Sequence, residues 1–188
     1  MPTVIFFGAV CRINLVVMTA AGPKKLPYAV ANFEQIHGEG YWLVDKTEYL
    51  RTLEQFQVPV FLRPRRFGKT LWCSTLECYY DILRKERFEE LFGGLAIGKN
   101  PTKLRNSFMV LRLNFSTVQV DLDLKILERN FTNLCNRLLQ DFVVRYATLL
   151  GPVRIDEGLP VSENLDRVLG VVKQQGLPPV YLMTDPVL

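Results

Sequence analysis

The residues with the clearest chemical potential form a basic run that leads into a helix-starting tripeptide. Arg63, Pro64, Arg65, Arg66 and Phe67 follow the apolar run 58–62 and precede Gly68-Lys69-Thr70-Leu71. A strand that passes through a loop ending in Gly-Lys-Thr and then enters a helix is how a P-loop holds phosphates, because the first N–H groups of the helix point at the anion. Residues 63–71 are therefore predicted to bind a nucleoside triphosphate.

Each residue of the tripeptide has its own predicted role. Gly68 has no Cβ, so a phosphate oxygen can approach the backbone closely. Lys69 would reach the β- and γ-phosphates, and the Thr70 hydroxyl would complete the coordination of a magnesium ion. The full motif has a glycine five residues before Gly68, where this chain has Arg63. The alternative interpretation is a basic turn before an amphipathic helix.

A second candidate metal residue is Asp185, which ends the apolar stretch 180–185. In P-loop proteins such an aspartate supports the magnesium ion from the strand beside the loop, so Thr70 and Asp185 are predicted to share the metal. The next residue is Pro186, which has no proton-accepting side chain to activate a water molecule. The sequence thus predicts ATP binding and leaves hydrolysis open. The alternative is that Asp185 only begins a turn before the proline.

The chain also resembles a known family over about residues 24–185. Besides the loop 63–70, the shared motifs are Leu26-Pro27-Tyr28, Asn32-Phe33, Val44-Asp45-Lys46-Thr47, Tyr79-Tyr80-Asp81, Phe88-Glu89-Glu90-Leu91-Phe92 and Ile97-Gly98-Lys99-Asn100. These motifs are similar, in the same order, to those of the bacterial AAA-ATPase-like family. The resemblance implies a P-loop ATPase core with ATP and Mg²⁺ as ligands, followed in full-length members by a nuclease-like domain of the PD-(D/E)XK type. We therefore expect a partial domain over 24–188, and an extension outside the core, or a misplaced start, over 1–23.

Composition limits the other classes of function. The chain has 188 residues, of which 48% are hydrophobic and 22% charged, and a formal net charge of +4, which suits one globular domain with anionic partners. Its four cysteines and single histidine, His37, lack the spacing of zinc ligands. The apolar stretches within residues 1–22 are too short to span a bilayer and lack a preceding basic region, although a weak export signal is the alternative. We expect a cytoplasmic protein without a membrane partner.

Periodicity predicts the elements that position these residues. An Asp45-to-Glu48 capping box should open a helix, and further helices are expected over 69–87, 121–150 and 162–175. Strands are expected over 58–62, 108–115 and 180–185, and residues 24–40 should form an irregular entry segment. This alternation predicts an α/β fold: a three-layer P-loop NTPase-like core with a mainly parallel sheet, incomplete at its C-terminus.

Two further hypotheses come from other classes of function. Arg63, Arg65 and Arg66, supported by Lys99, Lys103 and Arg105, could bind a nucleic-acid backbone, which predicts salt-sensitive binding that needs neither ATP nor magnesium. The resemblance also implies nucleic acid as a partner, through the nuclease-like domain of full-length members, which we expect to be missing from this chain. The other hypothesis is an inactive fragment whose open sheet aggregates and unfolds without cooperativity. The oligomeric state is left open.

Overall fold

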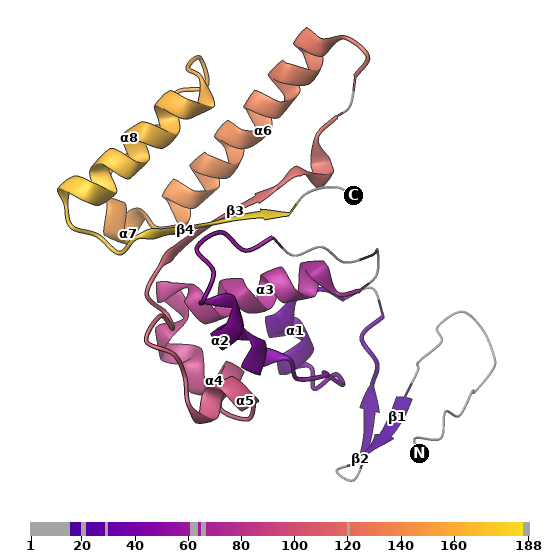
Figure 1. Cartoon of the computed structure of the whole chain (residues 1–188). Coiled ribbons are helices and arrows are strands. Elements are labelled where there is room, and N and C mark those ends of the chain that lie inside the picture. The colour runs from indigo at the N-terminus through magenta and orange to yellow at the C-terminus, as the bar shows by residue number, and fades with distance from the viewer. Residues whose placement is uncertain are drawn as a thin grey trace. The chain divides into compact units, whose positions relative to one another are not determined.

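A computed structural model of the chain describes residues 16–19, 22–28, 30–60, 64, 67–119 and 121–185, with the backbone alone described for 16–19, 22, 23 and 185. The described residues form two compact units (Figure 1). The first contains the residues up to Tyr79 together with Arg84–Lys103, and the second contains Tyr80–Leu83 together with the residues from Leu104 onward. Each unit is described by itself.

The first unit contains a small hairpin and several short helices. The hairpin is antiparallel and pairs β1 (Val16–Thr19) with β2 (Gly22–Lys25). The helical elements are α1 (Phe33–Gly38), η1 (Thr47–Tyr49), α2 (Leu50–Leu53), α3 (Lys69–Tyr80), α4 (Phe88–Phe92) and α5 (Ala96–Lys99). The 3-10 segment η2 (Ile82–Arg87) contributes to both units.

Aromatic rings form the core of the first unit. The ring of Phe92 on α4 stacks on Phe33 at 5.0 Å between centroids and on Phe88 at 5.3 Å, and it meets the Tyr79 ring edge-on at 5.4 Å. Pairs of this kind contribute about 0.5–1.5 kcal/mol beyond the area they bury. The Phe33 N–H donates to the Ser74 hydroxyl at 2.9 Å, which ties the start of α1 to α3.

The prediction of an irregular segment over 24–40 is wrong where α1 forms. The Asn32 side chain accepts a hydrogen bond from the Gln35 N–H and caps the helix, while Phe33 and Ile36 are fully buried. An asparagine cap followed by apolar residues three apart is a sufficient signal for one short helix, even between prolines and glycines.

The second unit is a parallel strand pair covered by helices. Strand β3 (Met109–Asn114) pairs with β4 (Val180–Asp185) in a register that runs from Met109↔Val180 to Asn114↔Asp185. Between them lie η3 (Phe115–Thr117), α6 (Leu124–Arg145), α7 (Ala147–Leu150) and α8 (Val161–Gln174). Helices α6 and α8 lie side by side on one face of this sheet (Figure 1).

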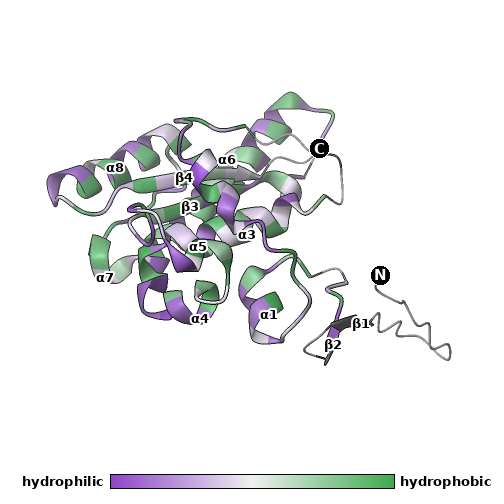
Figure 2. Ribbon diagram, turned by 60° about the horizontal axis from the view of Figure 1, so that its bottom comes forward, coloured by the Kyte–Doolittle hydropathy of each residue, from purple (hydrophilic) through white to green (hydrophobic). Residues whose placement is uncertain are grey.

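The packing of the second unit follows from its apolar spacing. Leu111 of β3, Leu139 and Phe142 of α6, and Val168 of α8 are buried in one cluster. Hydrophobic and hydrophilic residues alternate along α8 (Figure 2), and its buried Val168 and Val172 pack into the cluster. The predicted parallel pairing and the helix over 162–175 are confirmed. The helix expected over 121–150 is divided at Tyr146 into α6 and α7, and Asp123 caps α6 by accepting from the Lys125 N–H.

A buried carboxylate holds the second unit together. Asp81 has no exposed surface, and its side chain accepts hydrogen bonds from the Tyr146 hydroxyl at 2.8 Å and the Leu83 N–H at 2.9 Å, and pairs with Arg145. The Tyr146 oxygen in turn accepts from the Val110 N–H at 2.8 Å, which links α6 to β3. The backbone of Asp81 forms an isolated parallel β-bridge with Phe108, so α3 ends at Tyr80 and a 3-10 segment follows, whereas one helix to residue 87 was expected.

The prediction of a strand over 58–62 is wrong for its described part, residues 58–60. Residues 58–60 form no strand, and Val58 and Val60 are 84% and 77% exposed, while 61 and 62 lie outside the described residues. An apolar run resembles a buried strand, but Pro59 has no N–H to donate to a neighbouring strand. The α/β class is confirmed, and the three-layer P-loop core stays a prediction.

Across the described parts of the chain, no helix combines the length and the apolar character needed to cross a membrane.

Candidate functional site

The N-terminus of α3 is the local structure around which the candidate site is built. Gly68 has a φ of +75°, in the left-handed region that favours glycine, and its carbonyl accepts the Trp72 N–H at 2.9 Å. The half-buried Lys69 and the exposed Thr70 are then the first two residues of a 12-residue helix. The first N–H groups of a helix have no partner inside it and carry its partial positive charge. This end of α3 therefore favours an anion.

The structure describes only some of the remaining predicted site residues. Pro64 is exposed, Phe67 is 65% exposed, and Leu71 is half-buried on α3, whereas Arg63, Arg65 and Arg66 lie outside the described residues. Asp185 is the last residue of β4, where its backbone pairs with Asn114, and its side chain is not among those described. Thr70 belongs to the first unit and Asp185 to the second, so their shared metal site stays a prediction.

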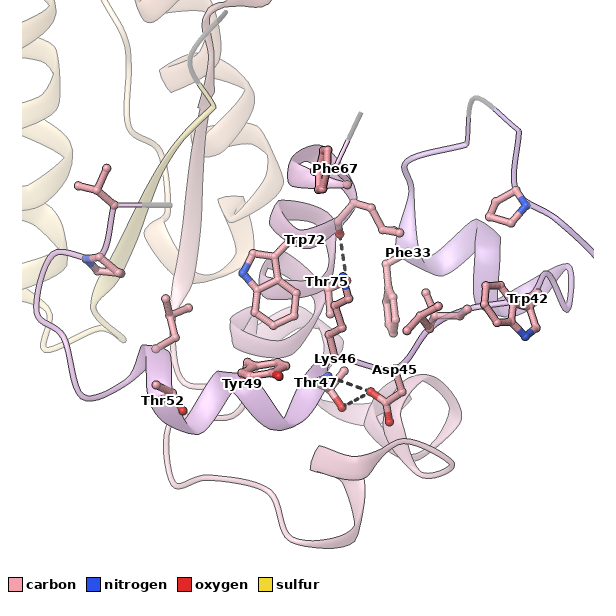
Figure 3. A pocket seen from close by; sticks show the side chains of 18 of the residues that line it. Phe33, Trp42, Asp45, Lys46, Thr47, Tyr49, Thr52, Phe67, Trp72 and Thr75 are labelled. Carbon is pink, nitrogen blue, oxygen red and sulfur yellow. Dashed lines mark hydrogen bonds between the residues drawn. The ribbon is translucent and has the colours of Figure 1, made fainter. Parts of the chain in front are cut away.

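A cavity of about 990 Å³ lies in the first unit beside the start of α3 (Figure 3). Its wall is drawn mainly from the segments 42–49, 52–60 and 67–75. Ligand cavities in proteins commonly measure about 300–1,000 Å³, so this one is large enough for a molecule of nucleoside size.

Six aromatic side chains line the cavity. They are Phe33, Trp42, Tyr49, Phe56, Phe67 and Trp72. Trp72 on α3 and Tyr49 on η1 face the same space (Figure 3). Phe56 and Tyr49 are 61% and 59% exposed, although aromatic side chains of a folded protein usually avoid water. Apolar side chains exposed together around a hollow are typical of a binding surface.

One edge of the cavity is polar and is organised by Asp45. One carboxylate oxygen accepts from the Thr47 N–H at 2.8 Å and the Thr47 hydroxyl at 2.7 Å, and the other accepts from the Ala96 N–H at 2.7 Å. Burial alone would raise the pKa of Asp45, but these hydrogen bonds outweigh it and hold the pKa below its ordinary value of 3.8. The carboxylate is therefore ionised at neutral pH.

The contacts of Asp45 differ from those of the expected capping box. Its side chain does accept a first-turn amide, but Lys46 occupies the cap position of η1, and no side chain makes a capping hydrogen bond there. The second oxygen instead reaches the start of α5, next to the Ile97 N–H that donates to the Thr47 hydroxyl at 3.2 Å. Asp45 thus joins η1 to α5.

The sequence predicted only part of the cavity wall as a site: Phe67, Gly68 and Leu71 belong to the predicted segment 63–71. The family resemblance also implies that the helix predicted after Asp45, which would carry Tyr49 and Phe56, borders the base of a nucleotide. Trp72 is predicted only as part of the apolar inward face of its helix, and Trp42 has no predicted role in a site. The one available signal is that tryptophan, tyrosine and phenylalanine are concentrated on both sides of the basic loop.

Metal-ligating side chains do not gather in the part of the chain that the structure describes: no three His, Cys, Asp or Glu residues lie close enough to hold an ion. This does not conflict with a nucleotide-bound magnesium ion. Mg²⁺ usually keeps several waters and takes phosphate oxygens with one or two protein ligands. The exposed Thr70 hydroxyl is suited to such a role.

Comparison with known proteins gives one family. A protein of Azotobacter chroococcum mcd 1, described as "Uncharacterized protein in vnfD 5'region", is 46% identical over 55 residues. The aligned segment is 28% of this chain and 11% of that protein, so the chain matches only a small part of its relative. No solved structure matches the chain. The family model described as "Predicted AAA-ATPase" matches residues 27–186, and the chain therefore belongs to the predicted AAA-ATPase family.

Proposed function

We propose that this chain binds ATP together with Mg²⁺ through the segment 63–71. The observation that carries the proposal is the left-handed Gly68 directly before α3, whose first two residues are Lys69 and Thr70. Membership of the predicted AAA-ATPase family supports it, because nucleotide binding is what the family description suggests.

The chemistry assigns a task to each residue. The first N–H groups of α3 bind phosphate oxygens, and the Lys69 ammonium balances the charge of the β- and γ-phosphates. Arg63, Arg65 and Arg66 add positive charge to the same loop. The Thr70 hydroxyl would hold the magnesium ion, which when bound neutralises part of the triphosphate charge.

The proposal concerns binding, not turnover. Catalysis of phosphoryl transfer depends on a group that positions the attacking water, and the residue after Asp185 is Pro186. Phosphate release measured alongside binding decides whether another group takes that task.

Thermal unfolding with and without ATP and magnesium tests the proposal. A ligand at about a hundred times its dissociation constant adds about 2.7 kcal/mol of stability. For a chain of this size that raises Tm by about 5–10 °C. Lys69→Ala should abolish the shift. Lys85→Ala, at an exposed lysine of η2, is the matched control and should keep it.

The other outcomes are equally informative. A cooperatively folded wild type with no ATP shift refutes the proposal, and salt-sensitive DNA binding would then favour the nucleic-acid hypothesis. Absence of any cooperative transition would favour the inactive fragment.

A further inference from the structure

The aromatic cavity begins where the proposed phosphate site ends. Gly68 precedes α3 and also lines the cavity, as do Leu71, Trp72 and Thr75 on the first two turns. At a rise of 1.5 Å per residue, Trp72 and Thr75 lie about 6 and 10 Å along the helix axis from Gly68. A ligand whose phosphates sit at the N-terminus of α3 can therefore extend directly into the cavity.

The wall of the cavity suits the uncharged end of such a ligand. Among its described lining residues only Asp45 and Lys46 carry charge, and their charges are opposite. The ionised Asp45 carboxylate disfavours phosphate inside the cavity, whereas the N-terminus of α3 favours it outside. The remaining wall is largely aromatic and aliphatic, which is the surface on which nucleobases stack.

We propose that the cavity is the nucleoside subsite, in which the base lies against Trp72 and Tyr49 while the triphosphate stays at the start of α3. This inference rests on the proposed ATP binding and specifies which end of the nucleotide each part of the first unit holds. A purine exposes a larger face for stacking than a pyrimidine, so ATP should bind more tightly than UTP.

The tryptophans provide a direct readout. The chain contains two tryptophans, Trp42 and Trp72, and both line the cavity. Trp42 is 38% exposed, so a base entering the cavity would change its contact with water. Intrinsic tryptophan fluorescence therefore reports on this cavity.

The experiment compares Mg-ATP with magnesium and inorganic tripolyphosphate, which has the phosphates but no nucleoside. Each is titrated while tryptophan fluorescence and thermal unfolding are followed. Both ligands should stabilise the chain, and only ATP should change the fluorescence.

Three variants sharpen the test. Trp72→Ala should weaken ATP binding about tenfold, as expected for one lost stacking contact, and leave tripolyphosphate binding unchanged. Tyr49→Ala, at a 59% exposed side chain whose loss leaves the core intact, should act in the same direction. Leu122→Ala removes a fully exposed side chain outside the cavity and should change neither ligand.

The failure of this inference is distinguishable from the failure of ATP binding itself. If ATP and tripolyphosphate change the fluorescence equally, or if both cavity variants bind ATP as tightly as wild type, the nucleoside lies elsewhere and only the phosphate site survives. If neither ligand stabilises the chain, the proposed function fails, and the subsite fails with it.

Discussion

Removing one oxygen atom from Tyr146 should strongly destabilise the second unit. The Tyr146 hydroxyl donates to the fully buried Asp81 at 2.8 Å and accepts from the Val110 N–H at 2.8 Å. Tyr146→Phe keeps the ring, which is itself completely buried, and deletes both hydrogen bonds. The change therefore tests the hydrogen bonds separately from the packing.

The magnitude follows from the groups left without partners. A hydrogen bond to a charged group contributes about 1.5–3 kcal/mol, and a buried N–H left unsatisfied costs about 1–3 kcal/mol. Asp81 keeps the Leu83 N–H and Arg145, so relaxation around it recovers part of the loss. We expect the free energy of unfolding to fall by about 2–4 kcal/mol. Urea denaturation followed by circular dichroism measures it.

The same residue predicts a change at alkaline pH. Burial raises the pKa of Tyr146, and the neighbouring Asp81 carboxylate raises it further, against an ordinary value of 10.0. Above pH 10 the unfolded chain releases this proton while the folded chain retains it, so stability falls as pH rises toward the folded pKa. Tyr146→Phe should not show this alkaline fall in stability. Subtracting its pH profile from that of wild type separates the effect of Tyr146 from that of the other tyrosines.

Tyr28→Phe is the matched control, because its side chain is 86% exposed. It should change stability by less than about 0.5 kcal/mol. A Tyr146→Phe protein within about 1 kcal/mol of wild type, with an unchanged alkaline slope, would refute the reasoning that Asp81 and Val110 depend on this hydroxyl.

Two further predictions concern the first unit. Asp45→Asn should lower the free energy of unfolding by about 1 kcal/mol at neutral pH. An amide has only one oxygen that accepts hydrogen bonds, so it cannot accept from both the Thr47 and the Ala96 N–H groups. Since the pKa of Asp45 is held below 3.8, its contribution to stability is present above that pH and fades as pH falls through the folded pKa. The free energies of unfolding of wild type and Asp45→Asn should therefore converge in an acid titration. A difference that stays constant with pH would contradict this argument. Gly68→Ala should lower the free energy of unfolding by about 1 kcal/mol, because alanine disfavours the φ of +75° that this position adopts. Crowding does not contribute, since no atom lies within 4 Å of the added Cβ. Gly38→Ala, at an equally open position without a positive φ, is its control, and equal losses in thermal unfolding would count against the conformational argument.

The elements that the sequence predicted correctly are those whose contacts lie within one compact unit and whose apolar spacing is regular. Strand β3 and helices α6 and α8 each contribute buried residues to one shared cluster, and Val180 of β4 packs against it, so local periodicity and tertiary packing agree. The run 58–62 shows the opposite case. Its composition alone resembled a buried strand, but Pro59 weakens the pairing, and Val58 and Val60 are exposed beside a cavity.

The candidate site divides in the same way. Gly68, Lys69 and Thr70 are adjacent in the chain, so their place at the start of a helix followed from local sequence. The cavity as a whole could not be predicted, because its wall joins the predicted residues Phe67, Gly68 and Leu71 to segments that are separate in the chain. Its polar edge depends on Asp45 reaching Ala96, 51 residues away. A pattern read along the chain contains no information about such a contact.

The substitution of Arg63 for the usual first glycine of the loop is compatible with the proposed site. A phosphate-binding loop requires glycine where φ is positive or where the ligand comes close to the backbone. Gly68 meets the first condition at the entrance to α3, with a φ of +75°, and the open space around its missing side chain leaves room for the second. The described residues assigned to the phosphates and to the base, from Gly68 to Trp72 and Tyr49, all belong to the first unit, whereas Asp185 belongs to the second. Loss of binding on changing Lys69 or Trp72 would therefore concern the first unit itself, whether or not the metal role predicted for Asp185 holds.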